Sequence, residues 1–314
     1  MNNEAQVTIL MLVWNALENI KLTLDSLYDS DEFFKLLIWD NGSNEETKNY
    51  LREFEKSHDN IKVFYSDKNI GTWNARYKLA QEADTEFVFT ADSDLFFPTK
   101  WLTPLLNTFK SQERVGQVGP LKLSRSIQHP YIANNIKSVW HEIENKISDP
   151  KLQLQNLTNM KSFDEFVDDL LKSNSTLRPD LDVPTRSIST CSMLTRRELF
   201  LDKAINDPAY SAINWGMEDV DYSWSLANLG YKVLKCTDTY IHHFEHSSLQ
   251  DNNTQMENSN YIKVLEYFLN KWEEALVSWC EKHTKEEISF DEFTLLVKKF
   301  NKINIPNKLK QYYL

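Results

Sequence analysis

Short apolar runs alternate with segments of helical spacing along the first part of the chain. The runs occupy residues 7–13, 35–39, 61–65, 87–89 and 115–118. Leu17, Ile20, Leu24 and Leu27 follow the first run at the spacing of one helix face. Continuous apolar runs are typical of strands buried on both faces, and their alternation with helices indicates parallel pairing. The pattern therefore predicts an α/β fold with a doubly wound, mostly parallel sheet.

Polar residues at the predicted helix starts are candidate caps. Asn15 is the candidate N-cap of the first helix, and Asn69 to Thr72 open a helix that runs to about Ala83. Serine followed three positions later by glutamate is the pattern of a capping box. Such pairs are Ser43 with Glu46, Ser162 with Glu165 and Ser289 with Glu292. Each pair predicts a helix that begins at its serine.

The regular alternation loosens after the fifth apolar run. Helical stripes over residues 135–147 and after Ser162 give this middle section the character of a helical insertion. Strand character returns at 185–194 and at 231–234, with a short helix expected at 196–203.

The composition changes again near Asn252. An apolar stripe from Tyr261 to Trp279 predicts one long helix, whose other face is mixed in charge. This face favours packing on the main domain or on a second subunit over membrane insertion. We therefore expect a main domain at 1–250, with halves at 1–120 and 121–250, and a helical extension at 251–314.

Polar residues follow each of the first four predicted strands. They are Trp14 and Asn15, Asp40 and Asn41, Asp67, and finally Asp92 and Asp94. Because parallel strands end at the same edge of a sheet, these side chains are expected to line one cleft.

Asp92-Ser93-Asp94 places two carboxylates directly after a buried strand, and Pro98 prevents the strand from continuing in the sheet centre. Two hard oxygen ligands at such a position suit Mg²⁺ or Mn²⁺ shared with substrate phosphates. A solvated acidic turn is the alternative. A calcium loop of the EF-hand type is excluded, because the required glycine and closing glutamate are missing.

A second acidic cluster occupies Glu218, Asp219 and Asp221, between Trp215 and Tyr222. Helical spacing downstream places it on the first turn of a helix, where the macrodipole partly offsets its charge. Simple helix capping explains one or two of these acids. Three carboxylates within four positions are costly without a function or a nearby cation.

His242, His243 and His246 lie within five residues of one another. Chance clustering of surface histidines is one interpretation. Because the Asp92 and Asp94 pair lacks further protein ligands, the other interpretation is that His242 or His243 completes a metal site.

Composition limits the classes of partner. The formal net charge of −11 disfavours nucleic acid. No apolar run approaches the ~20 residues of a membrane span, which leaves peripheral membrane contact open. Three cysteines without paired spacing and an N-terminus without a signal-peptide pattern favour a reducing, cytoplasmic compartment.

With these pieces in order, the sequence resembles the family-2 glycosyltransferases of the GT-A fold. The resemblance covers about residues 7–248. Its motifs are Val13-Trp14-Asn15, Asp40-Asn41-Gly42-Ser43, Asn69-x-Gly71, Asp92-Ser93-Asp94, Met193-Leu194-x-Arg196-Arg197, Gly216-x-Glu218-Asp219-x-Asp221 and a late histidine. The family implies a nucleotide-sugar donor (UDP-, dTDP- or GDP-linked), a divalent metal and inverting transfer to a saccharide, lipid-linked or protein acceptor.

The resemblance also implies roles for individual residues. The nucleotide-sugar site would comprise Val13, Trp14, Asn15, Asp40, Asn69, Gly71, Asp92 and Ser93. Mn²⁺ or Mg²⁺ would be held by Asp94 and Asp92, with His242, or His243 one step later. Asp219 matches the general base and Glu218 its neighbour. Residues 1–120 would bind the donor and 121–250 the acceptor, and the C-terminal helices are a candidate homodimer contact.

The sequence departs from the family at Tyr77 and Ser225, where the family has Asn and often Arg. It also lacks the Q-x-x-R-W motif, so a processive polysaccharide synthase is disfavoured. A sugar nucleotidyltransferase would need a glycine-rich, basic loop, which Val13 to Ala16 do not provide. A non-catalytic nucleotide- or carbohydrate-binding module is the remaining alternative, against which the retained carboxylates and histidine count.

Overall fold

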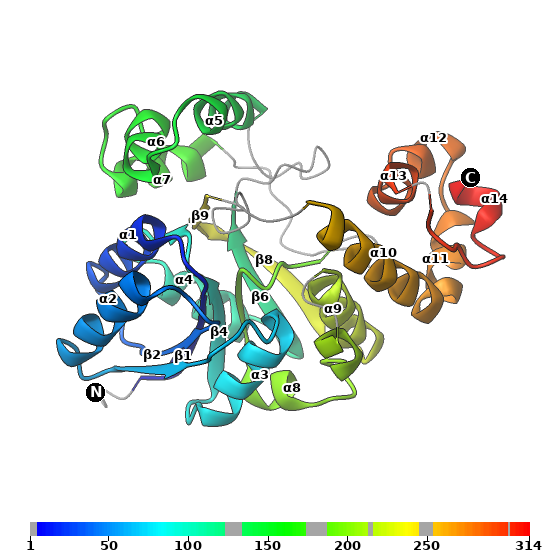
Figure 1. The fold of residues 1–314 in the computed structure, drawn as a ribbon. Helices are drawn as coiled ribbons and strands as arrows, with labels where there is room; N and C mark the ends of the chain where they lie inside the picture. The colour runs from blue at the N-terminus through cyan, green and yellow to red at the C-terminus, as the bar shows by residue number, and fades with distance from the viewer. Residues whose placement is uncertain (1–4, 123–133, 174–186, 213–215, 245–253, 301) are drawn as a thin grey trace.

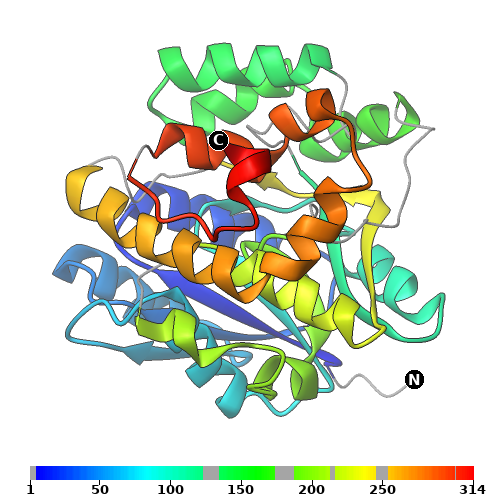
Figure 2. The same cartoon turned by 90° about the vertical axis from the view of Figure 1, so that its right-hand side faces the viewer.

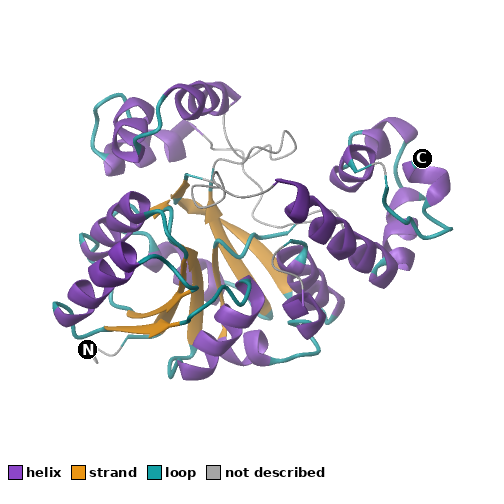
Figure 3. Cartoon of the chain, viewed as in Figure 1, coloured by secondary structure: helices purple, strands orange, loops and turns teal. Residues whose placement is uncertain are grey.

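A computed structural model of the chain describes residues 5–122, 134–173, 187–212, 216–244, 254–300 and 302–314. Its centre is a seven-stranded sheet with helices on both faces (Figure 1, Figure 3). In spatial order the strands are β3 (Ile61–Tyr65), β2 (Lys35–Asp40), β1 (Val7–Val13), β4 (Phe87–Asp92), β7 (Ser192–Arg196), β6 (Val115–Leu121) and β8 (Lys232–Tyr240). Strand β7 runs antiparallel to β4 and β6, and parallel pairing joins the other ladders. The predicted α/β fold with a mostly parallel sheet is confirmed.

Strand β1 shows how the sequence sets the layers. All of its residues are buried, as expected for a strand covered on both faces. Ile9 and Met11 pack on one side of the sheet, whereas Leu10 and Leu12 pack on the other. The first side is covered by α1 (Leu17–Tyr28), α2 (Glu45–Lys56) and α4 (Leu102–Lys110). The second is covered by α3 (Thr72–Glu82), α8 (Arg197–Leu201) and α9 (Glu218–Asn228), with the 3₁₀ helix η1 (Pro208–Ala212) beside α3.

The expected insertion consists of α5 (Asn134–Lys146), α6 (Pro150–Leu157) and α7 (Phe163–Ser173), which lie together in Figure 1. Trp140, Leu157 and Leu170 pack into the core on the second side of the sheet. The capping box predicted before α7 is present, because the Ser162 N–H donates to Glu165 and the Glu165 N–H donates to the Ser162 hydroxyl. The predicted strand at 185–194 lies partly outside the described residues.

The C-terminal region contains α10 (Thr254–Lys271), α11 (Glu273–Cys280), α12 (Lys285–Ser289), α13 (Glu292–Lys299) and α14 (Lys310–Tyr313). The prediction of one long helix is wrong, because the backbone leaves helical geometry at Trp272 and separates α10 from α11. Figure 2 shows these helices in front of α9. The buried Trp224 ring of α9 lies 4.8 Å from that of Phe268 and 5.3 Å from that of Trp272. No helix among the described residues is long and apolar enough to span a membrane.

Three of the predicted caps are wrong. Asn44 rather than Ser43 caps α2, since its side chain accepts a hydrogen bond from the Thr47 N–H. Helix α13 is capped by Asp291 rather than by Ser289. Before α1, the Asn15 side chain accepts from the Asn44 N–H and does not cap the helix. For α2 and α13 a polar residue one or two positions later takes the cap, whereas α1 begins after Ala16 without a side-chain cap.

Candidate active site

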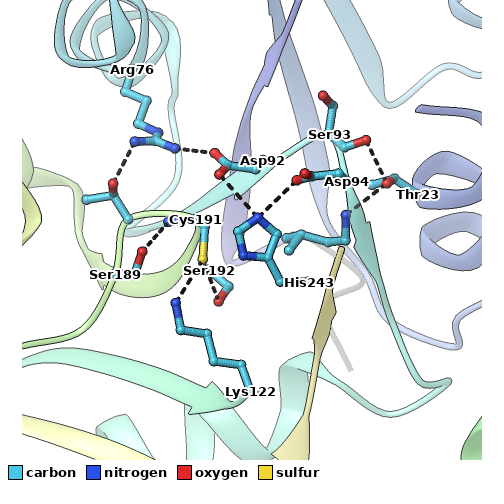
Figure 4. Close-up of polar contacts among 12 residues, drawn as sticks. Thr23, Arg76, Asp92, Ser93, Asp94, Lys122, Ser189, Cys191, Ser192 and His243 are labelled. Atoms are coloured by element: carbon cyan, nitrogen blue, oxygen red, sulfur yellow. Dashed lines mark hydrogen bonds and ion pairs between the residues drawn. The ribbon is translucent and has the colours of Figure 1, made fainter. Parts of the chain in front are cut away.

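A small second sheet brings the late histidines to the paired carboxylates. Strand β5 (Leu95–Phe96) pairs antiparallel with β9 (His242–His243), and Leu95 lies opposite His243. The Phe244 N–H donates to the carbonyl of Asp94 over 3.0 Å, which continues this pairing. The His243 Nε2 atom lies 3.1 Å from Asp94 Oδ1 and 3.7 Å from Asp92 Oδ2 (Figure 4). The register of β5 and β9 therefore unites both carboxylates with an imidazole.

His242 lies in different surroundings. Its Nδ1 atom is 2.8 Å from the Tyr240 hydroxyl, and its ring packs 4.3 Å from Trp140. Burial, together with the charge of His243, lowers the pKa of His242 to about 3. Successive side chains in a strand point to opposite faces, so only one of two neighbouring histidines can reach the carboxylates. That residue is His243, whose ring contacts Asp94, whereas the His242 ring contacts Tyr240 and Trp140.

Arg76 fixes the first carboxylate. This buried side chain on α3 places Nη2 2.5 Å from Asp92 Oδ1 and donates from Nη1 to the Thr190 hydroxyl over 2.6 Å. The Asp92 side chain remains 33% exposed, so one side of it is open to a ligand. Sequence reasoning gave Arg76 no role. Its position in the second helical turn after Gly71, on the buried face of the helix, was the signal that could have found it.

Cys191 and Lys122 are two further residues that sequence reasoning missed. The Lys122 ammonium lies 3.3 Å from the Cys191 sulfur, and the Asp92, Cys191 and His243 ligand atoms all lie within 4.8 Å of one another (Figure 4). Although burial raises the pKa of Cys191, Lys122 and His243 outweigh burial and lower it to about 6. Carboxylate, imidazole and thiol groups at this spacing form a donor set that suits a divalent transition metal.

The turns after β2 and β3 are bonded to each other. Asn41 Oδ1 accepts from the Ile70 N–H over 2.8 Å, and Asn69 Oδ1 accepts from both the Gly71 N–H and the Asn41 amide. Gly42 has φ +85°, and a Cβ there would lie 3.0 Å from the Lys68 backbone. Glycine is therefore required for the two turns to approach this closely.

The end of β1 joins the same network. The Val13 carbonyl accepts from the Asn41 N–H over 2.8 Å, and the Asn15 N–H donates to the Ser43 hydroxyl over 2.9 Å. Trp14 is partly exposed between these two bonds. The buried Asp40 accepts from the Ser43 N–H through Oδ1, whereas its Oδ2 has no hydrogen-bond partner among the described residues. An orphaned buried acceptor is costly, and a ligand N–H or O–H would satisfy it.

Ser93 contributes through its backbone rather than its side chain. Its carbonyl accepts from the buried Thr23 hydroxyl over 2.9 Å, and that hydroxyl in turn accepts from the Leu95 N–H (Figure 4). This bond ties the loop between the two carboxylates to α1.

The acidic turn of α9 begins on strained backbone. Gly216 and Met217 have φ values of +117° and +61°, and positive φ at a non-glycine residue is uncommon. The Glu218 carboxylate accepts from the Gly216 N–H over 2.6 Å and from the Thr72 hydroxyl over 3.2 Å. It therefore connects this turn to the start of α3. Trp215 lies outside the described residues.

Burial raises the pKa of both Glu218 and Asp219, and the Asp219 charge raises that of Glu218 further. Lys122 and Arg76 act in the opposite direction on the pKa of Asp219. Glu218 contacts Thr72 one helical turn before Arg76 on α3, and Arg76 contacts Asp92, so the two acidic clusters both lie beside the start of α3.

Asp221 is separate from its two neighbours. Its side chain is only 1% exposed, and it accepts from Lys271 Nζ over 2.8 Å and from the Trp272 indole over 2.7 Å. Both donors belong to the C-terminal helices. The third acid of the cluster therefore attaches α9 to α10 and does not face the site.

A doubly wound, mostly parallel sheet with paired carboxylates and a histidine at its carboxyl edge defines a protein of the GT-A fold. Two solved structures share this fold. The mannosyltransferase PcManGT from Pyrobaculum calidifontis, solved with GDP-Man and Mn²⁺, has a TM-score of 0.50 at 14% identity, covering 98% of this chain and 68% of that one. GalNAc-T7, solved with UDP, GalNAc and Mn²⁺, has a TM-score of 0.58 at 16% identity, covering 95% and 55%.

Residues 8–162, just under half of the chain, match the family model described as glycosyl transferase family 2, and this segment is a domain of that family. AglE, a glycosyltransferase of Haloferax volcanii, is 27% identical over 100 residues, which are 31% of this chain and 33% of AglE. TuaG of Bacillus subtilis, named for teichuronic acid biosynthesis, is 32% identical over 89 residues, which are 28% of this chain and 35% of TuaG. The matches thus span about a third of the length of these curated relatives.

Proposed function

We propose that the chain transfers a sugar from a nucleotide-diphosphate donor to an acceptor nucleophile with inversion at the transferred carbon. The observation that carries this proposal is the convergence of Asp92, Asp94 and His243 at the carboxyl edge of the sheet, beside the Glu218 and Asp219 turn. The nucleotides, sugars and Mn²⁺ bound in the two solved relatives support it. The donor is a UDP-, dTDP- or GDP-linked sugar, and the acceptor is a saccharide, a lipid-linked group or a protein.

The donor would lie along the strand ends of residues 1–120. Asp40 offers its unsatisfied Oδ2 to a base N–H, and Trp14, which follows the strand residue paired with Asp40, offers an aromatic face. Asp94, Asp92 and His243 would hold Mn²⁺ or Mg²⁺, which acts as a Lewis acid towards the charge that develops on the departing diphosphate. Arg76 keeps the Asp92 carboxylate oriented for this task through its short ion pair.

The acceptor would approach from the side of residues 121–250. Asp219, a partly exposed residue at the N-terminal turn of α9, would accept the proton of the attacking group. Its raised pKa suits a general base, because a carboxylate accepts a proton more readily as its pKa approaches the working pH. Glu218 holds the turn in place through Gly216 and Thr72. Lys271 of the C-terminal helices holds the other face of α9 through its bond to Asp221.

Calorimetric titration with UDP, dTDP and GDP, with and without Mn²⁺, tests the donor site. One of these nucleotides should bind more tightly with Mn²⁺, and Asp94→Asn should abolish that enhancement. Asp169→Asn, which changes an exposed carboxylate on α7, serves as the matched control and should behave like wild type. Equal, metal-independent affinity in wild type and Asp94→Asn would contradict the proposal. Metal-enhanced binding without hydrolysis or transfer of any donor sugar would indicate a binding module instead.

A further inference from the structure

A sulfur atom lies among the groups proposed to hold the cation. Among the described residues, Asp92, Cys191 and His243 form the one group of His, Cys, Asp or Glu side chains close enough to share a metal ion. The Cys191 side chain is 3% exposed and meets the same space that His243 and Asp92 line (Figure 4).

The position of this sulfur is set by the sheet. Ser192 pairs with Ala91 in the ladder between β7 and β4, and the Asp92 N–H donates to the Cys191 carbonyl over 3.0 Å. Cys191 is thus bonded through its backbone to the residue whose carboxylate is a proposed ligand. Lys122 reaches the sulfur from the end of β6, whereas His243 approaches from β9 (Figure 4).

We propose that Cys191 is a further ligand of this cation, so that the site combines carboxylate, imidazole and thiolate donors and prefers thiophilic divalent metals to Mg²⁺. The proposal rests on the proposed function for the position of the cation. Thiolate donors select ions such as Zn²⁺ and Cd²⁺, and mixed nitrogen and oxygen sites favour Co²⁺ over Mn²⁺. Mg²⁺ demands an octahedral oxygen shell and gains nothing from a thiolate.

Titration of the full-length protein with Co²⁺ tests the ligand directly, because a cobalt–thiolate bond produces a charge-transfer absorption band in the near ultraviolet. Wild type should show this band and should bind Co²⁺ more tightly than Mg²⁺. Cys191→Ser should lose the band and bind Co²⁺ at least ~10-fold more weakly, the smallest loss expected when a group supporting a metal is removed. Mg²⁺ affinity should stay the same.

Cys280→Ser and Cys236→Ser are matched controls, because both residues are buried free cysteines outside the metal-binding group found among the described residues. Both should keep the band. Absence of the band in wild type that has bound Co²⁺, failure of Co²⁺ to bind, or persistence of the band in Cys191→Ser would overturn the proposal. The wild-type spectrum decides the matter even if Cys191→Ser does not fold.

The test separates this proposal from the proposed function. A band without any metal-enhanced nucleotide binding would support the thiolate ligand and contradict the donor site. Metal-enhanced nucleotide binding without a band would do the reverse.

Discussion

The proposed donor edge, formed by the turns after β1, β2 and β3, and the acidic helix α9 are held in place by different means. At the donor edge, Asn41, Asn69 and Asn15 bond to neighbouring turns that all lie between β1 and α3. At the acidic helix, Asp221 bonds to Lys271 and Trp272, which follow it by 50 and 51 positions. One half of the site is therefore organised locally, and the other depends on a distant part of the chain.

This difference assigns a role to the C-terminal helices. They contribute no residue to the proposed donor site, yet they enclose one face of α9 while the sheet encloses the other. Changes in the C-terminal helices should thus affect stability and turnover more than donor affinity.

Removal of the C-terminal helices should have the largest effect. A chain that ends at residue 250 would expose Trp224 and the apolar face that now meets Phe268. Such a patch promotes aggregation, so we expect loss of thermal stability and association of the shortened chain. Thermal unfolding and light scattering measure both effects. A shortened chain that stays monomeric with an unchanged unfolding temperature would show that these helices are an independent appendage.

Lys271→Met should destabilise the folded chain by ~3–5 kcal/mol, because it leaves the buried Asp221 carboxylate without its cation. Urea unfolding measures this free energy. Lys263→Met changes an exposed lysine on the same helix and should have little effect. Asp221→Asn in the Lys271→Met background should recover part of the loss. Equal stability of the two lysine variants would contradict the role of the Asp221–Lys271 pair in attaching α9.

Asp219→Asn should reduce turnover by ~10²-fold or more and leave donor affinity nearly unchanged, because the amide cannot accept the proton of the acceptor. Glu218→Gln should cause a smaller loss, since it keeps the shape of the turn. Asp238→Asn, an exposed change on β8, is the control for both. Near-normal turnover in Asp219→Asn, or a product of retained configuration, would exclude this residue as the base of an inverting reaction.

The pH dependence of turnover should show a smaller effect with a defined sign. A general base must be unprotonated, so kcat/KM should fall as the pH drops through the pKa of Asp219. Burial raises that pKa above the ordinary aspartate value, so the fall should occur at higher pH than an ordinary aspartate would give. The profile of kcat/KM against pH measures it. An acid limb at or below the ordinary aspartate value would contradict the assignment.

The first three strands were predictable nearly to the residue, whereas β4, β6 and β8 run three to six residues beyond their predicted ends. Residues of β1 and β4 are buried on both faces, so apolar composition alone marks them. The positions of Asp92 and Asp94 were predictable for the same reason, because they follow directly after the apolar residues of β4. Local chemistry was less reliable, because the polar neighbours Ser43 and Asn44 are both good caps and only one can occupy the first position of α2.

The remaining parts of the site depend on pairings that sequence spacing does not reveal. His242 and His243 are equivalent as a sequence pattern, and the register of β9 against β5 decides which one meets Asp94. Cys191 lies far from Asp92 along the chain and reaches it only because β7 inserts antiparallel beside β4. In the sequence, Asp221 cannot be distinguished from the other two acids of the cluster. Its contact with Lys271, 50 positions later, is what separates it from them.

The pair of Asp221 and Lys271 also sets an order of events during synthesis. The carboxylate is added to the growing chain 50 residues before the ammonium that neutralises it. At ~5–20 residues per second, translation of that interval takes on the order of 3–10 seconds. Until then α9 cannot bury Asp221 without an uncompensated charge, whereas β1 to β4 and their turns are already complete. The nascent protein therefore completes its proposed nucleotide-binding edge before it can settle its proposed base.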